Sequence, residues 1–302
     1  MTKSFKGRTA VITGAASGFG LECSRIAAHE GMNVVMADVQ ADALSAAVRQ
    51  IEALGAPVLA QRLDIAHGDE VDALAAATRQ HFGVPHLVFN NAGVGSGGLI
   101  WENSIKDWEW VLGVNLWGVV HGVRAFTPMM LEAAASDVTY QGHIVNTASM
   151  AGLLNPPNMG IYNVSKHAVV SLSETLYQDL ALVTDQVHAH VLCPFFVPTG
   201  ISQSQRNRPD ALKDSAAPTR SALISQAMSD KAVGSGKVSA ADVAGKVFEA
   251  LRENRFYIYS HPKALQSVQT RLEDVVQGRN PSSPFKDRPE LGERLQKALR
   301  GI

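Results

Sequence analysis

The chain has 302 residues, of which 46% are hydrophobic and 18% charged, and its formal net charge is −1. This composition is typical of a globular protein, and the neutral balance without a basic run excludes a nucleic-acid partner held by charge. No apolar stretch is long enough for a signal peptide or a membrane span, so no membrane partner is expected. Cys23 and Cys193 lie far apart and outside any ligand motif. They are expected to be reduced thiols in the cytoplasm, and no metal site is expected.

Short apolar segments alternate with longer Ala- and Leu-rich segments along most of the chain. Most of the apolar runs are continuous, which is typical of strands covered by helices on both faces. The alternation predicts a single α/β domain with a doubly wound, Rossmann-type parallel sheet of about seven strands. Strands are predicted at residues 9–13, 33–38, 58–64, 86–90, 143–148, 187–193 and 255–259. Helices are predicted between them, among others at residues 18–30, 42–54, 69–82 and 104–131.

Two regions interrupt this rhythm. Residues 198–237 are polar and rich in turn-forming residues, and we interpret them as a mobile lid over the substrate. Residues 278–289 form a Pro-rich connector to a charged helix predicted at 290–300. We therefore expect a catalytic domain over residues 1–260 and a C-terminal extension over 261–302. The lid region contains four basic side chains: Arg206, Arg208, Lys213 and Arg220. They could contact an acidic substrate, but we favour a solvated face.

The first predicted strand runs into a glycine-rich loop at residues 13–20, and a helix is predicted to follow at once. The spacing alone also fits an ordinary turn, but this position lets backbone N–H groups approach a pyrophosphate at the positive helix end. The second strand ends at Asp38, whose carboxylate can accept both ribose hydroxyls and repel a 2′-phosphate. No Lys or Arg occurs at 15–17 or 39–41 to offset that repulsion. NAD is therefore favoured over NADP, and Asp64 is the expected partner of the adenine amino group.

Three further residues suggest carbonyl chemistry. Tyr162 and Lys166 are four residues apart on a predicted helix, so both project from one face. Ser149 ends the fifth predicted strand, where open α/β sheets bind ligands. Carbonyl reduction needs an acid for the developing alkoxide and a donor that holds the oxygen. Lowering the pKa of a phenol by about three units requires roughly 4 kcal/mol, which we expect from Lys166 and a positively charged nicotinamide.

Together these residues resemble the short-chain dehydrogenase/reductase family of the Tyr-dependent type. The resemblance rests on the loop at 13–20, the run Asn-Asn-Ala-Gly at 90–93, Asn115, Ser149 and the pair Tyr162 and Lys166, in the family's order and spacing. It implies that Asn115, in the helix before the fifth strand, helps to hold a water in a proton relay to Lys166. It also implies that residues 91–93 pack beside the adenosine ribose, and that the protein is a homotetramer or homodimer.

One segment departs from the family pattern. The family has Pro-Gly after its sixth strand and then a Thr that reaches the nicotinamide carboxamide. Here Pro194, Val197 and Thr199 fit that pattern, whereas Phe195 replaces the glycine. A ring at this position is expected to narrow the site and to change the local backbone.

The complete set of expected site residues follows from these motifs and from the resemblance. The expected catalytic residues are Asn115, Ser149, Tyr162 and Lys166. The expected cofactor-binding residues are Gly14, Ser17, Gly18, Phe19, Gly20, Asp38, Asp64, Ile65, Asn91, Ala92, Gly93, Tyr162, Lys166, Pro194, Val197 and Thr199. The expected substrate-binding residues are Ser149, Met150, Leu154, Tyr162, Phe195 and Phe196.

The sequence thus predicts an NAD(P)-dependent oxidoreductase that interconverts a secondary alcohol and a ketone or aldehyde, with an apolar or aromatic substrate and Tyr162 as general acid and base. One alternative is an NADPH-dependent carbonyl or 3-oxoacyl reductase. A non-enzymatic alternative is a catalytically silent dinucleotide sensor on the same fold.

Overall fold

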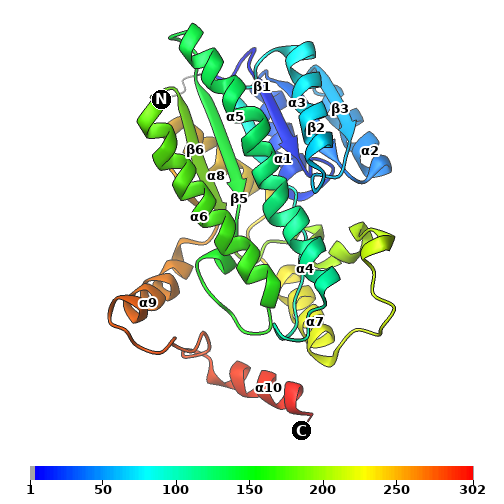
Figure 1. Ribbon diagram of the computed structural model, residues 1–302, viewed down its shortest axis with the longest axis vertical. Helices are drawn as coiled ribbons and strands as arrows, with labels where there is room; N and C mark the ends of the chain where they lie inside the picture. The colour runs from blue at the N-terminus through cyan, green and yellow to red at the C-terminus, as the bar shows by residue number, and fades with distance from the viewer. Residues whose placement is uncertain (1–3, 302) are drawn as a thin grey trace.

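The computed structural model describes residues 4–301 and contains one seven-stranded sheet in the order β3-β2-β1-β4-β5-β6-β7 (Figure 1). Every neighbouring pair of strands is parallel. The strand order reverses between β1 and β4, which is the position where open α/β sheets form a ligand crevice. The predicted Rossmann-type sheet is confirmed. The strands are β1 (Thr9–Thr13), β2 (Asn33–Asp38), β3 (Val58–Arg62), β4 (Leu87–Asn90), β5 (Gly142–Thr147), β6 (Val187–Cys193) and β7 (Tyr257–Tyr259).

Helices cover both faces of the sheet because consecutive strand residues point to opposite sides. In β1, Ile12 packs into a core with residues of α1, α2 and α8, whereas its neighbour Val11 packs against α3, α5 and α6. Both side chains are fully buried, so the strands read as continuous apolar runs. The helices around the sheet are α1 (Gly18–His29), α2 (Ala41–Glu52), α3 (Gly68–Phe82), α4 (Ile105–Leu112), α5 (Gly118–Ser136), α6 (Gly160–Val183) and α8 (Ala240–Glu253).

The single helix predicted at 104–131 is wrong in one respect, because a π-helical segment, Gly113–Trp117, separates α4 from α5. This segment carries Asn115. Directly after it, the helix passes so close to the loop after β3 that a Cβ on Gly118 would lie 2.3 Å from Cδ1 of Ile65. π-helical turns inside α-helices are frequent at functional sites.

The strand predicted at 58–64 is shorter in the structure. β3 lies at the edge of the sheet and is only partly buried. Beyond Arg62 the chain turns, since Asp64 accepts a hydrogen bond from the backbone N–H of Ala66 at 3.0 Å. Asp64 therefore lies in a loop at the end of the sheet, next to the end of β2.

The lid region contains more helix than its polar composition predicts. Two short helical segments, Gly200–Asn207 and Asp210–Leu212, precede α7 (Arg220–Gly234), in which only Ser221 and Val233 are buried. The extension forms α9 (Leu265–Val276) and α10 (Pro289–Arg300). In Figure 1, α7, α9 and α10 lie at the end of the molecule toward which the strands point. Within residues 4–301, no helix is both long and apolar enough to cross a bilayer.

Candidate active site

A cleft with a volume of about 2160 Å³ lies at the carboxyl ends of the strands and reaches out between the lid and the extension. Nearly all of the predicted cofactor-binding and substrate-binding residues line it. The exceptions among the site residues are Gly20 and the catalytic candidate Asn115, which lie behind its wall. Positions spread from residue 14 to residue 199 are thereby brought to one edge of the sheet.

The glycine loop has the backbone that a phosphate cradle requires. Gly14 has a φ of +65°, a conformation that side chains with a Cβ rarely adopt. A Cβ on Gly20 would lie 2.2 Å from the carbonyl oxygen of Gly14, so only glycine fits there. Ser17 occupies the N-cap position of α1 without a side-chain capping hydrogen bond, and the first turn holds no acidic residue. The free backbone N–H groups at the positive end of α1 therefore fit an anion such as a pyrophosphate.

Thr13 connects this loop to the chain that follows β4. Its hydroxyl oxygen accepts hydrogen bonds from the backbone N–H groups of Asn91 and Ala92, at 3.0 and 3.1 Å. The Asn91 side chain donates in return to the carbonyl oxygen of Thr13 at 2.9 Å. Thr13 is absent from the predicted site residues, although its position directly before Gly14 is the signal that could have identified it.

Asp38 is 8% exposed at the end of β2 and lines the cleft. Its Oδ2 accepts a hydrogen bond from the backbone N–H of Ala16 and its Oδ1 from that of Gln40, both at 3.0 Å. A carboxylate has about four acceptor positions, so two remain for hydroxyl groups. Asp38 thus contacts the glycine loop directly and keeps the capacity to bind a ribose.

Lys166 is 3% exposed, and its Nζ donates to the carbonyl oxygen of Thr147 at 2.8 Å. The same nitrogen lies 5.8 Å from the centre of the Tyr162 ring. Burial lowers the pKa of Lys166 from 10.5 to about 8, an effect that Cys193 opposes. The amine therefore exchanges protons within the physiological pH range.

The Tyr162 hydroxyl lies beside the side chain of Ser149. Burial raises the pKa of Tyr162 above its ordinary value of 10, and a hydrogen bond with the Ser149 side chain opposes that rise. In the protein alone, Ser149 rather than Lys166 is the group that lowers the pKa of the phenol. The Ser149 hydroxyl also accepts the backbone N–H of Ala151 at 3.1 Å, which fixes it beside Tyr162.

Asn115 is fully buried and joins the loop after β4 to α6. Its Oδ1 accepts the backbone N–H of Val94 at 2.8 Å. Its Nδ2 donates to the Val94 carbonyl oxygen at 3.0 Å and to the Ser165 hydroxyl at 3.1 Å. Gly93 passes between the two catalytic candidates, since a Cβ there would lie 3.3 Å from Asn115 Oδ1 and 3.5 Å from Lys166 Nζ. Both amide N–H groups are engaged, which leaves one lone pair on Oδ1 for a relay water.

Phe195 occupies the position where the family has glycine. Its ring is 41% exposed, lines the cleft and packs against Phe196 at 4.6 Å between ring centres. Its backbone N–H donates to the Ser260 hydroxyl at 2.9 Å. Among the non-glycine residues at 4–301, only Asn158 and Asn254 have a positive φ. The backbone at Phe195 is therefore one that any residue can adopt.

Comparison with known proteins agrees with this geometry. The family model for the short chain dehydrogenase matches residues 8–210. The chain belongs to the short-chain dehydrogenase family. Like other members, it is an NAD(P)-dependent oxidoreductase that interconverts an alcohol and a carbonyl compound.

Three similar proteins illustrate the relationship. A crystal structure of a short-chain dehydrogenase from Burkholderia phymatum in complex with NAD is 52% identical, with a TM-score of 0.91, covering 94% of this chain and 99% of the other. The CLA biosynthesis dehydrogenase/reductase of Lactiplantibacillus plantarum is 33% identical over 91% of this chain and 95% of its own. The 1-deoxy-11-beta-hydroxypentalenate dehydrogenase of Streptomyces exfoliatus is 36% identical over 89% and 88%.

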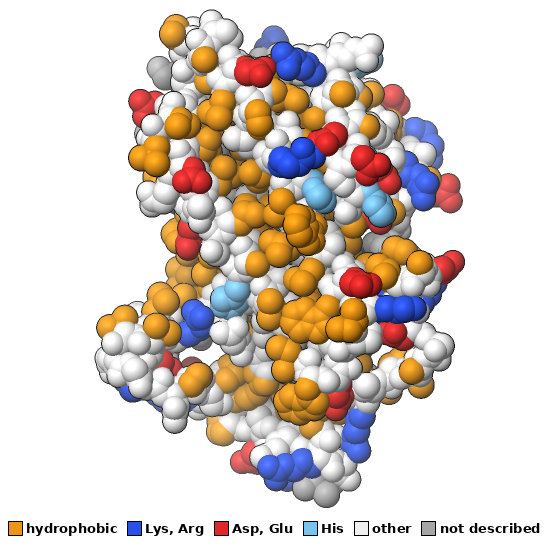
Figure 2. Space-filling model, in the orientation of Figure 1, with side chains coloured by type: hydrophobic (Ala, Val, Ile, Leu, Met, Phe, Trp, Pro, Cys, Tyr) orange, Lys and Arg blue, Asp and Glu red, His pale blue; other side chains and the backbone are white. Residues whose placement is uncertain are grey.

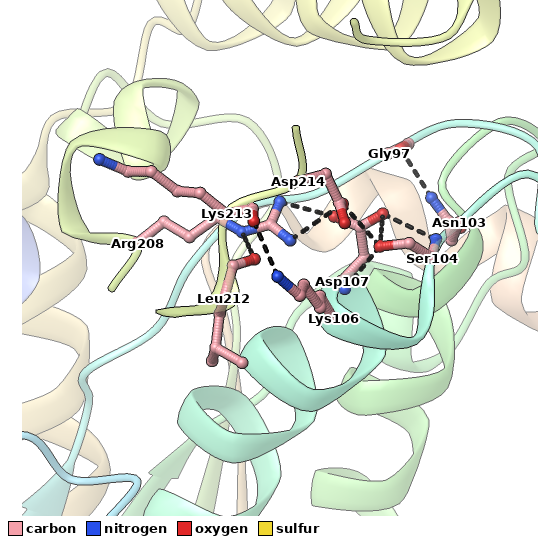
Figure 3. A network of polar contacts seen from close by, with 9 residues as sticks. All are labelled: Gly97, Asn103, Ser104, Lys106, Asp107, Arg208, Leu212, Lys213 and Asp214. Carbon is pink, nitrogen blue, oxygen red and sulfur yellow. Dashed lines mark hydrogen bonds and ion pairs between the residues drawn. The ribbon is translucent and has the colours of Figure 1, made fainter. Parts of the chain in front are cut away.

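A polar network fastens the lid of this dehydrogenase to the start of α4 (Figure 3). Nη1 of Arg208 donates to Oδ1 of Asp107 at 2.6 Å, and its guanidinium lies 5.2 Å from the centre of the Trp110 ring. The Arg208 side chain is only 7% exposed. The interpretation of the lid cations as a solvated face is therefore wrong for Arg208, because its partner stands 101 positions earlier in the chain.

Asp107 links this network to the segment that carries Asn115. While its Oδ1 binds Arg208, its Oδ2 accepts the backbone N–H of Ser104 at 2.9 Å and completes the cap of α4. α4 leads directly into the π-helical segment that carries Asn115. One carboxylate oxygen of Asp107 thus binds the lid, and the other caps the helix that leads to Asn115.

Replacing Arg208 by methionine is expected to loosen the lid, because Asp107 loses its partner while the packing on Trp110 is largely kept. Losing one member of a well-buried pair costs about 3–5 kcal/mol, and part of that cost appears here as local opening. Hydrogen exchange at residues 200–219 should accelerate, and KM for substrate should rise more than kcat falls. The control is Lys213→Met, which breaks the pair with the exposed Asp210. Equal behaviour of the two variants would contradict the role of Arg208.

The lowered pKa of Lys166 has a consequence for stability. Between pH 8 and 10.5 the unfolded chain holds a proton that the folded chain has released. The free energy of unfolding contributed by this group therefore rises with pH across that window, by up to about 1.4 kcal/mol per pH unit. Urea unfolding of the wild type and of Lys166→Met at pH 7.5 and pH 9.5 measures it. The difference between the proteins should shift in favour of the wild type at the higher pH, and a constant difference would refute the assignment.

Proposed function

We propose that this dehydrogenase uses NAD to interconvert an apolar or aromatic secondary alcohol and the corresponding ketone or aldehyde, with Tyr162 as the general acid and base. The observation that carries the proposal is the convergence of Tyr162, Ser149 and Lys166 on the cleft that also contains the glycine loop and Asp38. The residues for proton transfer and those for dinucleotide binding therefore line one cavity.

The chain's own residues account for the proton chemistry. Ser149 donates to the substrate oxygen and holds it beside Tyr162, whose hydroxyl passes its proton to the developing alkoxide during reduction. Lys166, fixed by the Thr147 carbonyl, stabilises the resulting phenolate and exchanges the proton onward at a pKa of about 8. Asn115 connects the loop after β4 to α6 through hydrogen bonds to Val94 and Ser165. A bound nicotinamide supplies the hydride exchange and, when oxidised, a positive charge that favours the phenolate.

Asp38 supports the preference for NAD. It is directed at the glycine loop from the end of β2, with acceptor capacity left for ribose hydroxyls, and a 2′-phosphate beside it would meet like charge. The NAD bound to the Burkholderia phymatum structure agrees with this preference.

The substrate side of the cleft supports an apolar or aromatic substrate. Phe195 and Phe196 lie in contact on one wall, and Met150 and Leu154 stand on the segment after Ser149. Small-molecule sites usually measure about 300–1,000 Å³, so a cleft of about 2160 Å³ has room for a dinucleotide together with a bulky substrate.

We further propose that the protein is a cytoplasmic homotetramer or homodimer. Hydrophobic side chains gather on the face where α4, α5 and α6 lie (Figure 2). Trp117 on this side is 53% exposed, and Leu182 and Val183 at the end of α6 are 84% and 68% exposed. Such apolar exposure is typical of a surface that another subunit covers. Both cysteines are buried and free, which suits a reducing compartment.

Replacing Tyr162 by phenylalanine tests the catalytic role. The variant should bind NAD as the wild type does, whereas NAD-linked turnover of a panel of aromatic and alicyclic alcohols should fall at least about 100-fold, because the proton donor is lost. The matched control is Tyr177→Phe on the same helix, at a side chain that is 42% exposed. Turnover at the wild-type rate in Tyr162→Phe would refute the mechanism and favour a sensor function.

Replacing Asp38 by asparagine tests the cofactor preference. The asparagine side chain keeps one acceptor oxygen for the glycine loop, and the substitution removes the charge that repels a 2′-phosphate. The wild type should bind NAD at least tenfold more tightly than NADP, since one like-charge contact is worth about 1.4 kcal/mol or more. In Asp38→Asn, measured by fluorescence titration, NADP affinity should rise toward that of NAD. Tighter binding of NADP than NAD by the wild type would overturn the preference.

A further inference from the structure

A series of contacts encloses the part of the cleft beside the glycine loop. It begins at the loop, where the backbone N–H of Ala16 donates to Asp38 Oδ2, and continues through Asp38 Oδ1 to the backbone N–H of Gln40, both at 3.0 Å. The Oε1 atom of Gln40 then accepts a hydrogen bond from Nε of Arg206 at 3.3 Å. This last contact joins the lid to the loop after β2, although the two residues are 166 positions apart.

The contacts return to the glycine loop from the other side. Nη1 of Arg206 donates to the carbonyl oxygens of Gly200 and Gln203 at 2.9 and 2.8 Å. Gly200 follows Thr199, whose Cβ and Cγ2 would each lie 3.5 Å from a Cβ on Gly18. Thr199 therefore lies next to the glycine loop, and the residues of this series, apart from Ala16, line the cleft. We call the set the collar. The collar consists of Ala16, Gly18, Asp38, Gln40, Thr199, Gly200 and Arg206.

Arg206 carries a charge that its neighbours do not balance. All of its hydrogen-bond partners are neutral amide or carbonyl oxygens. The other two cations of residues 198–219 are each paired, Arg208 with Asp107 and Lys213 with Asp210. Within residues 4–301, Arg206 forms no ion pair, and the two N–H groups of its Nη2 have no hydrogen-bond partner. An arginine always keeps its charge, and its planar donors match the oxygens of a phosphate.

We propose that Arg206 binds the pyrophosphate of the dinucleotide, so that the collar closes over the bound cofactor. The inference rests on the proposed NAD-dependent function. Gly18, at the N-terminus of α1, and Arg206, on the lid, belong to different segments of the collar and both line the cleft. The helix N–H groups and the guanidinium therefore contact the same anion from two directions. The contact between Arg206 and Gln40 must open for the cofactor to enter and to leave.

The test compares Arg206→Gln, Arg206→Lys and the control Lys213→Gln, a lid cation that also lines the cleft but is already paired. Each protein is titrated calorimetrically with NAD, with ADP-ribose, which keeps the pyrophosphate, and with adenosine, which has no phosphate. Arg206→Gln should bind NAD and ADP-ribose about tenfold or more weakly, as expected for one charge-assisted hydrogen bond. It should bind adenosine unchanged, release NAD faster in stopped-flow experiments, and show a weaker dependence of NAD affinity on salt. Arg206→Lys should recover part of the affinity.

The alternative outcomes are distinguishable. If the wild type does not bind NAD, the proposed function itself fails. If the wild type binds NAD and Arg206→Gln binds it equally well, only the collar is refuted. An equal loss for adenosine would show that Arg206 merely supports the fold of the lid. A loss confined to NADP, measured in parallel, would place the guanidinium at the 2′-phosphate instead and overturn the assignment to the pyrophosphate.

Discussion

The hydroxyl oxygen of Thr13 accepts hydrogen bonds from two backbone N–H groups of the chain that leaves β4. The rest of the site depends on these two bonds, because they connect the ends of β1 and β4. β1 and β4 are neighbours in the sheet, yet the chain leaves them on opposite sides. A crevice therefore opens between their ends. Thr13 joins the two sides of that crevice, the glycine loop on one side and residues 91–93 on the other.

The proton-transfer residues depend on the same sheet edge. β5 ends beside β4, so Thr147 offers its carbonyl to Lys166 and Ser149 lies next to Tyr162. Burial then acts in opposite directions on the two titrating groups, lowering the pKa of Lys166 and raising that of Tyr162. Both pKa shifts have the same cause, because an apolar setting disfavours the charged form of each group.

Two arginines of the lid connect it to the rest of the protein, and their surroundings differ. Arg208 is buried between Asp107 and Trp110 and fixes the lid to α4. Arg206, two positions earlier, extends the other way to Gln40 and keeps its charge uncompensated. One cation therefore anchors the lid to the protein, and the other leaves it able to respond to an anionic ligand.

The sequence by itself determined the sheet, the glycine loop and the residues proposed as catalytic. The sheet and the loop depend on local patterns, namely continuous apolar strands and closely spaced glycines. Tyr162 and Lys166 are four positions apart, whereas Asn115 and Ser149 were assigned from the order and spacing of the family they resemble. The tertiary structure decided the rest: the π-helical segment around Asn115, the ordinary backbone at Phe195, the partner of Arg208 and the position of Arg206 beside Gln40. Each of these depends on contacts between segments far apart in the chain, such as the 166 positions between Arg206 and Gln40. Such contacts leave no periodic signal, because only the packing of the complete sheet and lid brings their partners together.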